Sequence, residues 1–236
     1  MALRLRSRPF HLEHIASALV IAPHPDDEAI GCGGTAALIA RERATLELAF
    51  ITDGSASHPS HPNVSAAEIA KRRRDEAQEA TGILGVEWQR VTFLDARDGT
   101  ISQLDGQQAL ELDVRIAELL KRASPKAILL PCRRDGSSEH DAAFVRVMSA
   151  LEKTGMKVRV LEFPVWSWWN PLLMWEPIFS CRRIWRVDIR QVRGLKSLAI
   201  ASYASQTQPI PPDIAPALPY GFVRAFLGGA EYLFEW

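Results

Sequence analysis

The sequence predicts an α/β fold in which helices flank a mostly parallel sheet, built as a single domain. Short apolar runs alternate with longer amphipathic stretches, a pattern typical of β-α units around a parallel sheet. The 236 residues suffice for one large buried core and are marginal for two. Hydrophobic residues make up 47% and charged residues 24%, as in ordinary globular proteins. We therefore expect one Rossmann-like domain over residues 1–236, with its core at about residues 17–206.

The predicted elements before residue 164 alternate between strand and helix. Each strand is a short apolar run, and each helix carries apolar residues at helical spacing. The best-marked helix is Ser65–Leu84, because Ser65 and Glu68 form a capping-box pattern and Gly85 follows its end. In order, we expect a strand at Ala18–Ala22, a helix opened by glycines 31, 33 and 34 that runs through residues 36–43, a strand at Leu46–Ile51 ended by Thr52-Asp53-Gly54, the helix at Ser65–Leu84, a strand at Val91–Leu94, a helix at Gln107–Arg122, a buried strand at Ala127–Pro131, a polar loop at residues 133–139, a helix at about Asp141–Lys153 and a strand at Val158–Phe163.

A Trp/Pro-rich C-terminal part follows Phe163. Five of the seven tryptophans fall within residues 166–185, and prolines 164, 171 and 177 interrupt the stretch, so we expect an irregular aromatic segment. A helix at Val192–Tyr203 and a Pro-rich turn region at residues 209–219 then lead to an apolar C-terminus. The tryptophans could stack on a sugar ring, although burial against the sheet or at a subunit interface is the commoner use of such residues.

Charge and cysteine content argue against several classes of protein. The 28 basic and 28 acidic residues balance, so nothing indicates the basic face that nucleic-acid binding requires, and we expect a small-molecule substrate. The three cysteines are widely spaced without a C-x-x-C pair, which favours buried free thiols. No run reaches 18 apolar residues, so we expect a cytoplasmic protein without a membrane span. The tryptophans and the apolar C-terminus suggest a possible homo-oligomer.

A His-Pro-Asp-Asp-Glu stretch at residues 24–28 follows the first predicted strand, where α/β sheets place their ligands. Pro25 favours an extended His24 and a helical turn directly afterwards, so that His24 and Asp27 can converge on one point. Asp26, rotated by about 100° in such a turn, must point elsewhere. Because catalytic zinc takes three protein ligands and keeps an open water position, a third ligand should follow another strand.

His140 is the predicted third ligand, because it follows a buried strand and stands at a helix start where Ser138 and Asp141 make a capping-like pair. A His-Asp-His set suits zinc best and also accepts other divalent ions. Singly, the acids could merely cap the next helix, but the combination favours a metal site. The remaining histidines rank lower: His58 and His61 in a Ser/Pro-rich loop, and His11 and His14 before the first strand.

Two other kinds of site find little support in the sequence. The glycines at 31, 33 and 34 lack the G-x-G-x-x-G spacing of a dinucleotide loop, and the three acids before them would repel phosphate. A Ser-His-Asp triad has no G-x-S-x-G element here, and Cys32 has no evident partner.

These motifs resemble the LmbE-like (PIG-L) family of metal-dependent N-acetylglucosaminyl deacetylases, whose hallmark is an Ala/Pro-His-Pro-Asp-Asp-Glu stretch. The resemblance covers most of the chain from Ala18 to about Gln206. It rests further on Ile30-Gly31-Cys32-Gly33-Gly34-Thr35, Thr52-Asp53-Gly54, Arg73-Arg74-Asp75-Glu76-Ala77, Leu84-Gly85-Val86, Phe93-Leu94-Asp95, Asp98-Gly99, Lys196 and Tyr203-Ala204-Ser205-Gln206.

The resemblance implies a single deacetylase domain in which His24, Asp27 and His140 hold zinc or another divalent ion. It further implies that metal-activated water, with Asp26 as general base, removes an N-acetyl or other N-acyl group from an aminosugar or its conjugate. The second family motif, usually His-Pro-Asp-His, is Ser-Ser-Glu-His at residues 137–140, and the missing histidine usually stabilises the oxyanion or protonates the amine. The alternative is therefore a non-catalytic member that binds metal and sugar.

Three residues are candidate substrate contacts. Arg73 matches an arginine of the family, although a solvated charged face explains three consecutive arginines equally well. Asp135 lies beside Arg134 in the loop before His140, and its position alone makes it a candidate. Ser137 stands where the family has its histidine and could help to hold the oxyanion.

Overall fold

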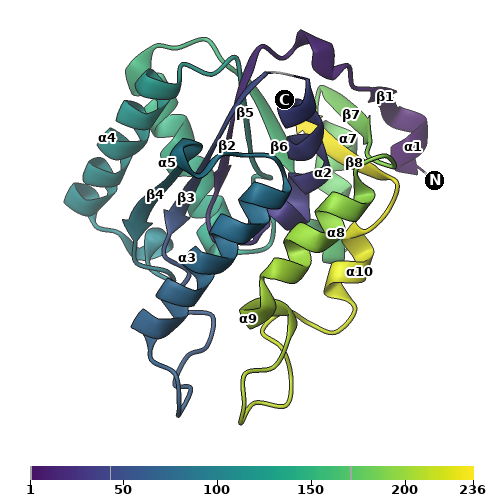
Figure 1. Ribbon diagram of the computed structural model, residues 1–236. Coiled ribbons are helices and arrows are strands. Elements are labelled where there is room, and N and C mark those ends of the chain that lie inside the picture. Colours follow the sequence, from purple (N-terminus) through teal and green to yellow (C-terminus); the bar gives the residue numbers. More distant parts are fainter. Residues whose placement is uncertain (1, 43, 171) are drawn as a thin grey trace.

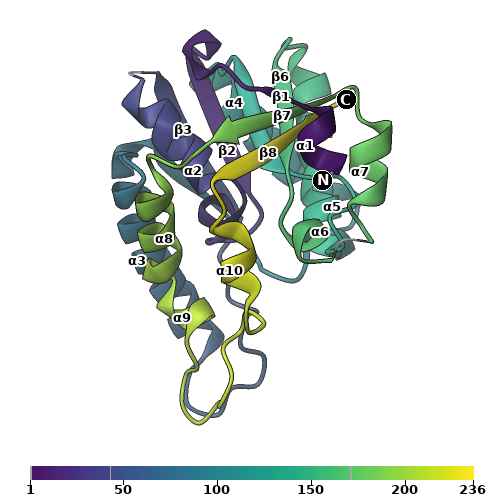
Figure 2. The same ribbon diagram turned by 90° about the vertical axis from the view of Figure 1, so that its right-hand side faces the viewer.

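The computed structural model describes residues 2–42, 44–170 and 172–236, which build one eight-stranded sheet in the order β1-β7-β8-β6-β5-β2-β3-β4 (Figure 1). The five strands from β4 to β6 pair in parallel, and β8 runs antiparallel to both of its neighbours. Helices cover both faces of the sheet (Figures 1 and 2). The predicted α/β class, a mostly parallel sheet flanked by helices, is confirmed.

The strands are β1 (Ser7–Pro9), β2 (Ser17–Ala22), β3 (Thr45–Thr52), β4 (Val91–Ala96), β5 (Ala127–Pro131), β6 (Arg159–Phe163), β7 (Arg183–Asp188) and β8 (Ala230–Glu235). The α-helices are α1 (Ala2–Arg6), α2 (Asp27–Arg41), α3 (Ala66–Ile83), α4 (Gly106–Ala123), α5 (Ser138–Thr154), α6 (Trp166–Trp169), α7 (Trp175–Ser180), α8 (Arg193–Ser202), α9 (Ala204–Thr207) and α10 (Phe222–Phe226). Short 3-10 helices lie at Leu12–His14, Trp88–Arg90 and Ile101–Gln103.

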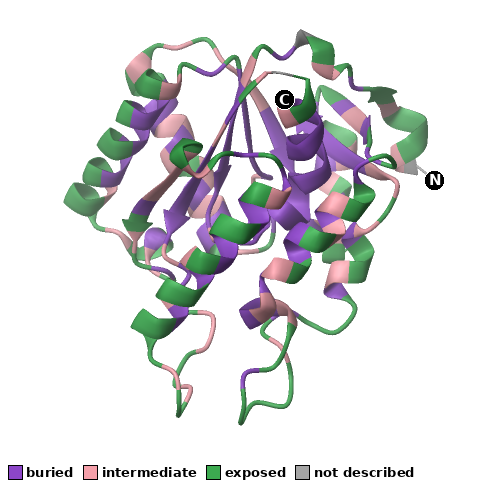
Figure 3. Ribbon diagram, in the orientation of Figure 1, coloured by how far each residue is buried: buried purple, intermediate pink, exposed green. Residues whose placement is uncertain are grey.

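The core lies on both faces of the sheet, because the central strands are buried on both sides. In β2, Val20 and Ala22 belong to the apolar cluster beneath α2, α3 and α8, whereas Leu19 and Ile21 belong to the cluster beneath α4 and α5. Side chains of a strand alternate between faces, so a strand covered twice is a continuous apolar run. Figure 3 shows the result, with buried residues along the sheet and α2 and exposed ones on the outer helix faces.

α2 begins earlier than predicted, at Asp27, but its backbone is non-helical at Cys32, with a φ of −139°, so two helical segments meet there at a kink. Gly31 precedes the kink, and Gly33 and Gly34 begin the second segment, which corresponds to the predicted helix. The helix needs them because it packs directly on neighbouring chain. A Cβ at Gly31 would lie 2.1 Å from Phe163 Cδ2, and one at Gly34 would lie 2.6 Å from Ile189 Cγ2. Close approach therefore explains the glycines that looked like a helix start. The predicted end at Arg43 lies outside the described residues.

Several other predictions are confirmed. The strand at residues 127–131 has the predicted bounds. α3 carries the predicted capping box, in which Ser65 Oγ accepts from Glu68 N at 3.3 Å and Ser65 N donates to Glu68 Oε2 at 2.8 Å. The three cysteines are buried and free.

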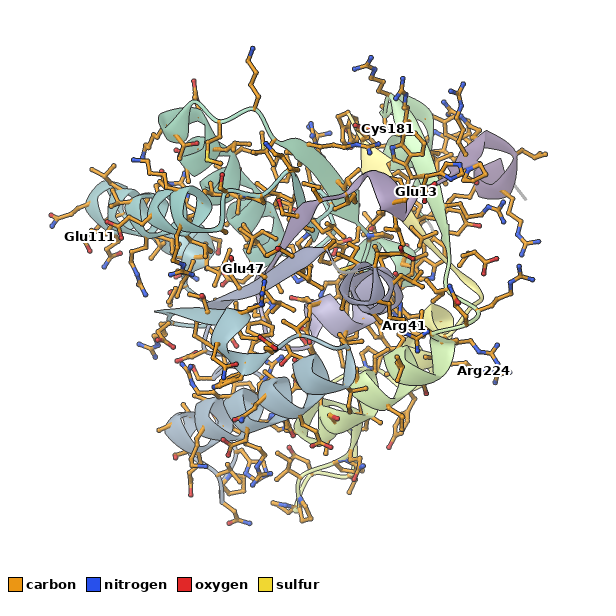
Figure 4. All side chains as sticks on the ribbon, turned by 45° about the horizontal axis from the view of Figure 1, so that its top comes forward. Glu13, Arg41, Glu47, Glu111, Cys181 and Arg224 are labelled. Atoms are coloured by element: carbon orange, nitrogen blue, oxygen red, sulfur yellow. The ribbon has the colours of Figure 1, made fainter. Side chains whose placement is uncertain are left out.

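The C-terminal part is more regular than predicted. The stretch expected to be irregular contains α6, α7 and β7, and β8 inserts between β6 and β7 as the antiparallel strand. α10 turns Phe222 and Phe226 inward, while its exposed Arg224 lies at the margin of the molecule in Figure 4. Pro171 lies outside the described residues.

Two loops extend beyond the carboxyl ends of the strands, at the lower edge of Figure 1. They comprise residues 53–65, after β3, and residues 208–221, between α9 and α10. They meet where His61 Nε2 lies 3.1 Å from the Ile210 carbonyl oxygen. Within the described ranges, no helix combines the length and the apolar character that crossing a membrane demands.

Candidate metal centre and cavity

The candidate centre lies at the carboxyl ends of β2 and β5, which are neighbours in the sheet. The chain diverges from these two strands, since β3 and β4 extend to one side and β6 to the other. Such a switch point leaves a crevice that side chains from both strand ends can reach. His24 follows β2 directly, and His140 lies in the first turn of α5, beyond the loop that leaves β5.

The three predicted ligands converge on one carboxylate oxygen. Asp27 Oδ2 lies 3.1 Å from His24 Nδ1 and 3.3 Å from His140 Nε2. One ligand atom from each residue lies within 4.8 Å of the other two. The structure thus brings the predicted triad together, and its role in metal binding stays a prediction.

The surroundings of these atoms suit a cation. His140 is fully buried, and within the described chain its Nε2 has no hydrogen-bond partner, because its contact with Asp27 lacks hydrogen-bond geometry. A buried ring nitrogen without a hydrogen-bond partner costs free energy of folding unless a ligand binds to it. Two imidazoles and a carboxylate are also a donor set that zinc and related ions take. The residues present therefore fit a divalent ion.

The electrostatics of the triad also favour positive charge at this point. Burial alone would raise the pKa of Asp27, but the nearby imidazoles of His140 and His24 hold it well below its usual range. Burial alone would lower the pKa of each histidine, but the adjacent acids raise that of His24 to about 9 and that of His140 to about 10. The carboxylate of Asp27 thus stays ionised and keeps both imidazole rings protonated. A bound cation would replace the positive charge of these protonated rings.

Two further buried acids hold the far nitrogen of each candidate histidine ligand. Asp98 Oδ1 lies 3.1 Å from His24 Nε2, and Asp135 Oδ2 lies 2.8 Å from His140 Nδ1. These contacts turn His24 Nδ1 and His140 Nε2 toward Asp27, the arrangement in which carboxylates orient metal-binding imidazoles. This role of Asp98 was not predicted from the sequence. The feature that could have indicated this role is the position of Asp98, two residues after the end of β4, at the same edge of the sheet as His24.

Asp135 was predicted as a candidate substrate contact, and its burial argues otherwise. It has no exposed surface, and its carboxylate also accepts hydrogen bonds from the backbone N–H groups of Val165, Trp166 and Ser167. It does not line the cavity. We therefore reassign Asp135 to positioning His140 and the start of α6.

Asp26 is set apart from Asp27 by an unusual backbone conformation, not by rotation within a helical turn as predicted. It precedes α2 with a φ of 137°, a region that residues with a Cβ rarely adopt. Its N–H donates to Glu28 Oε2 at 3.0 Å, and Glu28 Oε1 accepts from the Tyr203 hydroxyl at 2.6 Å. Burial raises the pKa of Asp26 to about 7, against the lowering effect of Arg73.

Arg73 is buried, so the alternative of a solvated charged face is wrong for this residue, whereas Arg72 and its neighbour Lys71 are exposed. Its Nη2 lies 3.0 Å from Asp26 Oδ1 and also donates to the Pro25 carbonyl. Its Nη1 donates to the Gly54 carbonyl at 3.2 Å. Arg73 lines the cavity, and a direct substrate contact stays a prediction.

The start of α5 differs from the predicted capping pair of Ser138 and Asp141. The helix begins at Ser138, with Ser137 as its N-cap residue and no side-chain cap hydrogen bond. Asp141 instead accepts from the Asp135 N–H at 3.0 Å. Glu139 accepts from the N–H groups of residues 101 and 102, so it anchors the short helix after β4.

A cavity of about 610 Å³ opens at this centre, within the range of about 300–1,000 Å³ that small-molecule sites have. His24, Asp26 and Asp27 line it, whereas His140 lies behind them. Ser137 lines it, as predicted for a residue near the substrate. The rest of the lining comprises Ile30, Ala56, Ser57, Arg73, Asp98, Gly99, Gly136, Ser138, Glu139, Val165, Trp166, Gln206, Ala217, Leu218 and Phe222.

Comparison with known proteins gives a family match and curated relatives that match about half of the chain. The family described as PIG-L, GlcNAc-PI de-N-acetylase, matches residues 19–151, more than half of the chain. The diacetylchitobiose deacetylase of Thermococcus kodakarensis is 30% identical over 125 residues, which cover 53% of this chain and 43% of that protein. The match thus spans less than half the length of that relative.

Solved structures share the fold at lower identity. The N,N'-diacetylchitobiose deacetylase of Pyrococcus horikoshii superposes with a TM-score of 0.66 and 21% identity, covering 86% of this chain and 74% of that one. GalB of Pseudomonas putida, a 4-carboxy-2-hydroxymuconate hydratase, superposes with a TM-score of 0.65 and 24% identity, covering 80% of this chain and 79% of that one. At these identities the likeness establishes the fold alone.

Proposed function

The chain belongs to the PIG-L family, and from that premise we propose that it is a metal-dependent amide hydrolase that removes an N-acetyl or other N-acyl group from an aminosugar or its conjugate. One observation carries the proposal: His24, Asp27 and His140 converge beside a separate acid, Asp26, where a single cavity is lined by His24, Asp26 and Asp27. The relative from Thermococcus supports the reaction class, because its name describes deacetylation of an N-acetylated aminosugar.

The three ligands would hold Zn²⁺ or another divalent ion, which when bound would polarise the amide carbonyl and make a water molecule acidic. Asp98 and Asp135 would hold the imidazole rings of His24 and His140 in the orientation that binds the ion. Zinc is the preferred ion because two histidines and one carboxylate suit it best.

Asp26 would act as the general base. As water attacks the amide carbon, the carboxylate accepts a proton from it. When the C–N bond then breaks, the same carboxyl returns that proton to the leaving amine. In the metal-free protein, burial raises the pKa of Asp26 to about 7, and a carboxyl whose pKa is raised in this way can donate a proton as well as accept one. Arg73 would hold Asp26 in place and favour its ionised form.

Ser137 would take over part of the work of the missing family histidine. Its side chain does not cap α5, and it lines the cavity beside the helix N-terminus, where backbone N–H groups favour negative charge. The products would be a carboxylate, acetate in the simplest case, and a free amine.

The decisive experiment is acetate release from a panel of N-acetylated aminosugars and their conjugates. The protein would be assayed as purified, after chelation, and after chelation with zinc restored, together with metal analysis of each sample. We expect release that chelation removes and zinc restores. Because the same fold occurs in a hydratase, release of acetate is the readout that distinguishes the reaction.

Binding of metal and sugar without release of acetate would instead support the alternative, a non-catalytic member of the family. The replacement of the second-motif histidine by Ser137 is the observation that keeps this alternative in view.

A further inference from the structure

Asp26, the proposed base, has a backbone conformation that its own sequence does not favour. Its φ is 137° and its ψ is −29°, outside the regions that residues with a Cβ normally occupy. Such a conformation persists only where the surrounding structure holds it. The contacts made by this stretch of backbone therefore help to decide where the Asp26 carboxylate lies.

Glu28 supplies one of these contacts. Its Oε2 accepts a hydrogen bond from the Asp26 N–H at 3.0 Å, so the side chain reaches back over the start of α2. Its Oε1 accepts from the Tyr203 hydroxyl at 2.6 Å. Glu28 has no exposed surface and does not line the cavity. A carboxylate whose two oxygens both accept hydrogen bonds is fixed in orientation, and Glu28 can therefore hold the backbone of Asp26.

Tyr203 comes from a distant part of the chain, 175 positions after Glu28, between α8 and α9. It is 1% exposed and does not line the cavity. Its carbonyl oxygen accepts from the N–H groups of Gln206 and Thr207, both at 3.0 Å, so α9 fixes the residue. α8 in turn packs against α2 and α3 (Figure 1). The hydroxyl thus reaches Glu28 from a firmly held position.

The same segment is tied to the residue that holds the Asp26 carboxylate. Ser205 donates to Glu76 from its N–H at 2.7 Å and from its hydroxyl at 2.6 Å. Glu76 lies one turn after Arg73 on α3, and Arg73 Nη2 lies 3.0 Å from Asp26 Oδ1. Residues 203–205 therefore connect to Asp26 along two routes, one to its backbone and one to its side chain.

We propose that Tyr203 is a positioning residue, which through Glu28 holds the backbone of Asp26 in the conformation that presents its carboxylate to the cavity. The proposal rests on the proposed function, since it concerns the base of the same site. Tyr203 does not reach the cavity, so it acts through Glu28 and not on a substrate.

Tyr203→Phe removes only the hydroxyl and is the first test. With the zinc-restored protein and the best substrate of the aminosugar panel, kcat should fall by about 10–100-fold, because a small displacement of the base misaligns it. KM and zinc content should stay those of the wild-type protein. A lower melting temperature with unchanged kcat would show a purely structural role and overturn the proposal.

Tyr232→Phe is the matched control. Tyr232 is also buried, but it lies in β8, stacks on Trp168 and does not line the cavity. This variant should keep the kcat of the wild-type protein. An equal fall of kcat in Tyr203→Phe and Tyr232→Phe would mean that loss of any buried phenol hydroxyl is enough, and would overturn the proposal.

A double variant tests the route through Glu28. Glu28→Gln keeps the shape of the side chain, but its amide offers one carbonyl oxygen to two donors. If Tyr203 acts through Glu28, Tyr203→Phe should lower kcat less in the Glu28→Gln background than in the wild-type protein. The same fold-change in both backgrounds would contradict the route.

Hydrogen exchange of the Asp26 amide measures the positioning without turnover. Tyr203→Phe should speed this exchange relative to that of the Thr52 N–H, which donates to the Pro23 carbonyl at 2.9 Å. If the wild-type protein releases no acetate, faster exchange in Tyr203→Phe and not in Tyr232→Phe would uphold the positioning role while rejecting the hydrolase. Equal exchange in all three proteins would reject the positioning role.

Discussion

The two parts of the chain contribute differently to the cavity. Residues 19–151, the part that the family matches, supply all the ionisable side chains in the cavity lining. Residues 152–236 supply uncharged ones, and most of these are apolar. On the proposed function, this difference would divide chemistry and substrate choice along the chain. The ionisable groups lie at the ends of the central strands and on α3, and the later elements supply mostly apolar lining.

The strongest test of this division is Asp26→Asn, a change confined to the first part. It should lower turnover by about 10²–10⁴-fold, because the general base is lost while the ligands remain. Acetate release and metal content would be measured on the same sample. Unchanged turnover would remove Asp26 from the reaction, and loss of the metal would show that the substitution had disturbed the ligands.

The pH dependence of metal binding tests the triad directly. The pKa values of His24 and His140 are raised to about 9 and about 10, so both rings are protonated at neutral pH in the metal-free protein. A metal must displace these protons, so affinity should fall as pH decreases, by up to about 100-fold per unit between pH 6 and 8. Titration calorimetry in buffers of different ionisation enthalpy counts the protons released. Release of none would contradict the assignment of both rings.

Asp98→Asn and Asp135→Asn should each weaken metal binding by about 10–100-fold, because both acids orient a ligating imidazole. Competition with a chelator measures the affinity. Asp113→Asn is the control, since Asp113 is equally buried but bonds to Ser149 and Lys153, far from the triad. The control should lower the melting temperature and leave metal affinity unchanged. Loss of affinity in the control as well would mean that the effect reflects general destabilisation.

The smallest effect is expected at Ser65, which caps α3, the helix that carries Arg73. Ser65→Ala removes the hydrogen bond that Ser65 Oγ accepts from Glu68 N and the one that it donates to Glu68 Oε2, and should cost about 0.5–2 kcal/mol in the free energy of unfolding. Denaturant unfolding measures it, with acetate release at low temperature as the second readout. We expect stability to fall while turnover stays the same, since Ser65 lies outside the cavity lining.

Much of the central fold could be predicted because its patterns are local. β5 is a fully apolar run, and α3 begins with a capping box, so few residues decide each element. The start of α2 could not be predicted in this way. Its glycines mark the second helical segment, after the kink at Cys32, whereas the first segment from Asp27 has no such signal in the sequence. Contact with Phe163 and Ile189 explains why Gly31 and Gly34 carry no side chain.

The candidate site was also only partly predictable. His24 and Asp27 converge as predicted, but through a turn with a φ of 137° at Asp26 and not through a helical turn. The strand ends of a parallel sheet explain why His140 joins them. The role of Asp135 could not be inferred, because a loop acid looks exposed until the fold buries it. Asp98 was missed because its partner, His24, follows a different strand, far away in the sequence.

By itself, the sequence determined the α/β class, the family resemblance and the residues that form the triad, because strand pattern and motif spacing act over a few residues. The tertiary structure decided which acids hold the imidazoles, that Arg73 is buried against Asp26, and that Trp166 and Phe222 line one side of the cavity. These features depend on contacts between segments far apart in the chain, such as Trp166 with Phe222, and local patterns carry no information about such contacts.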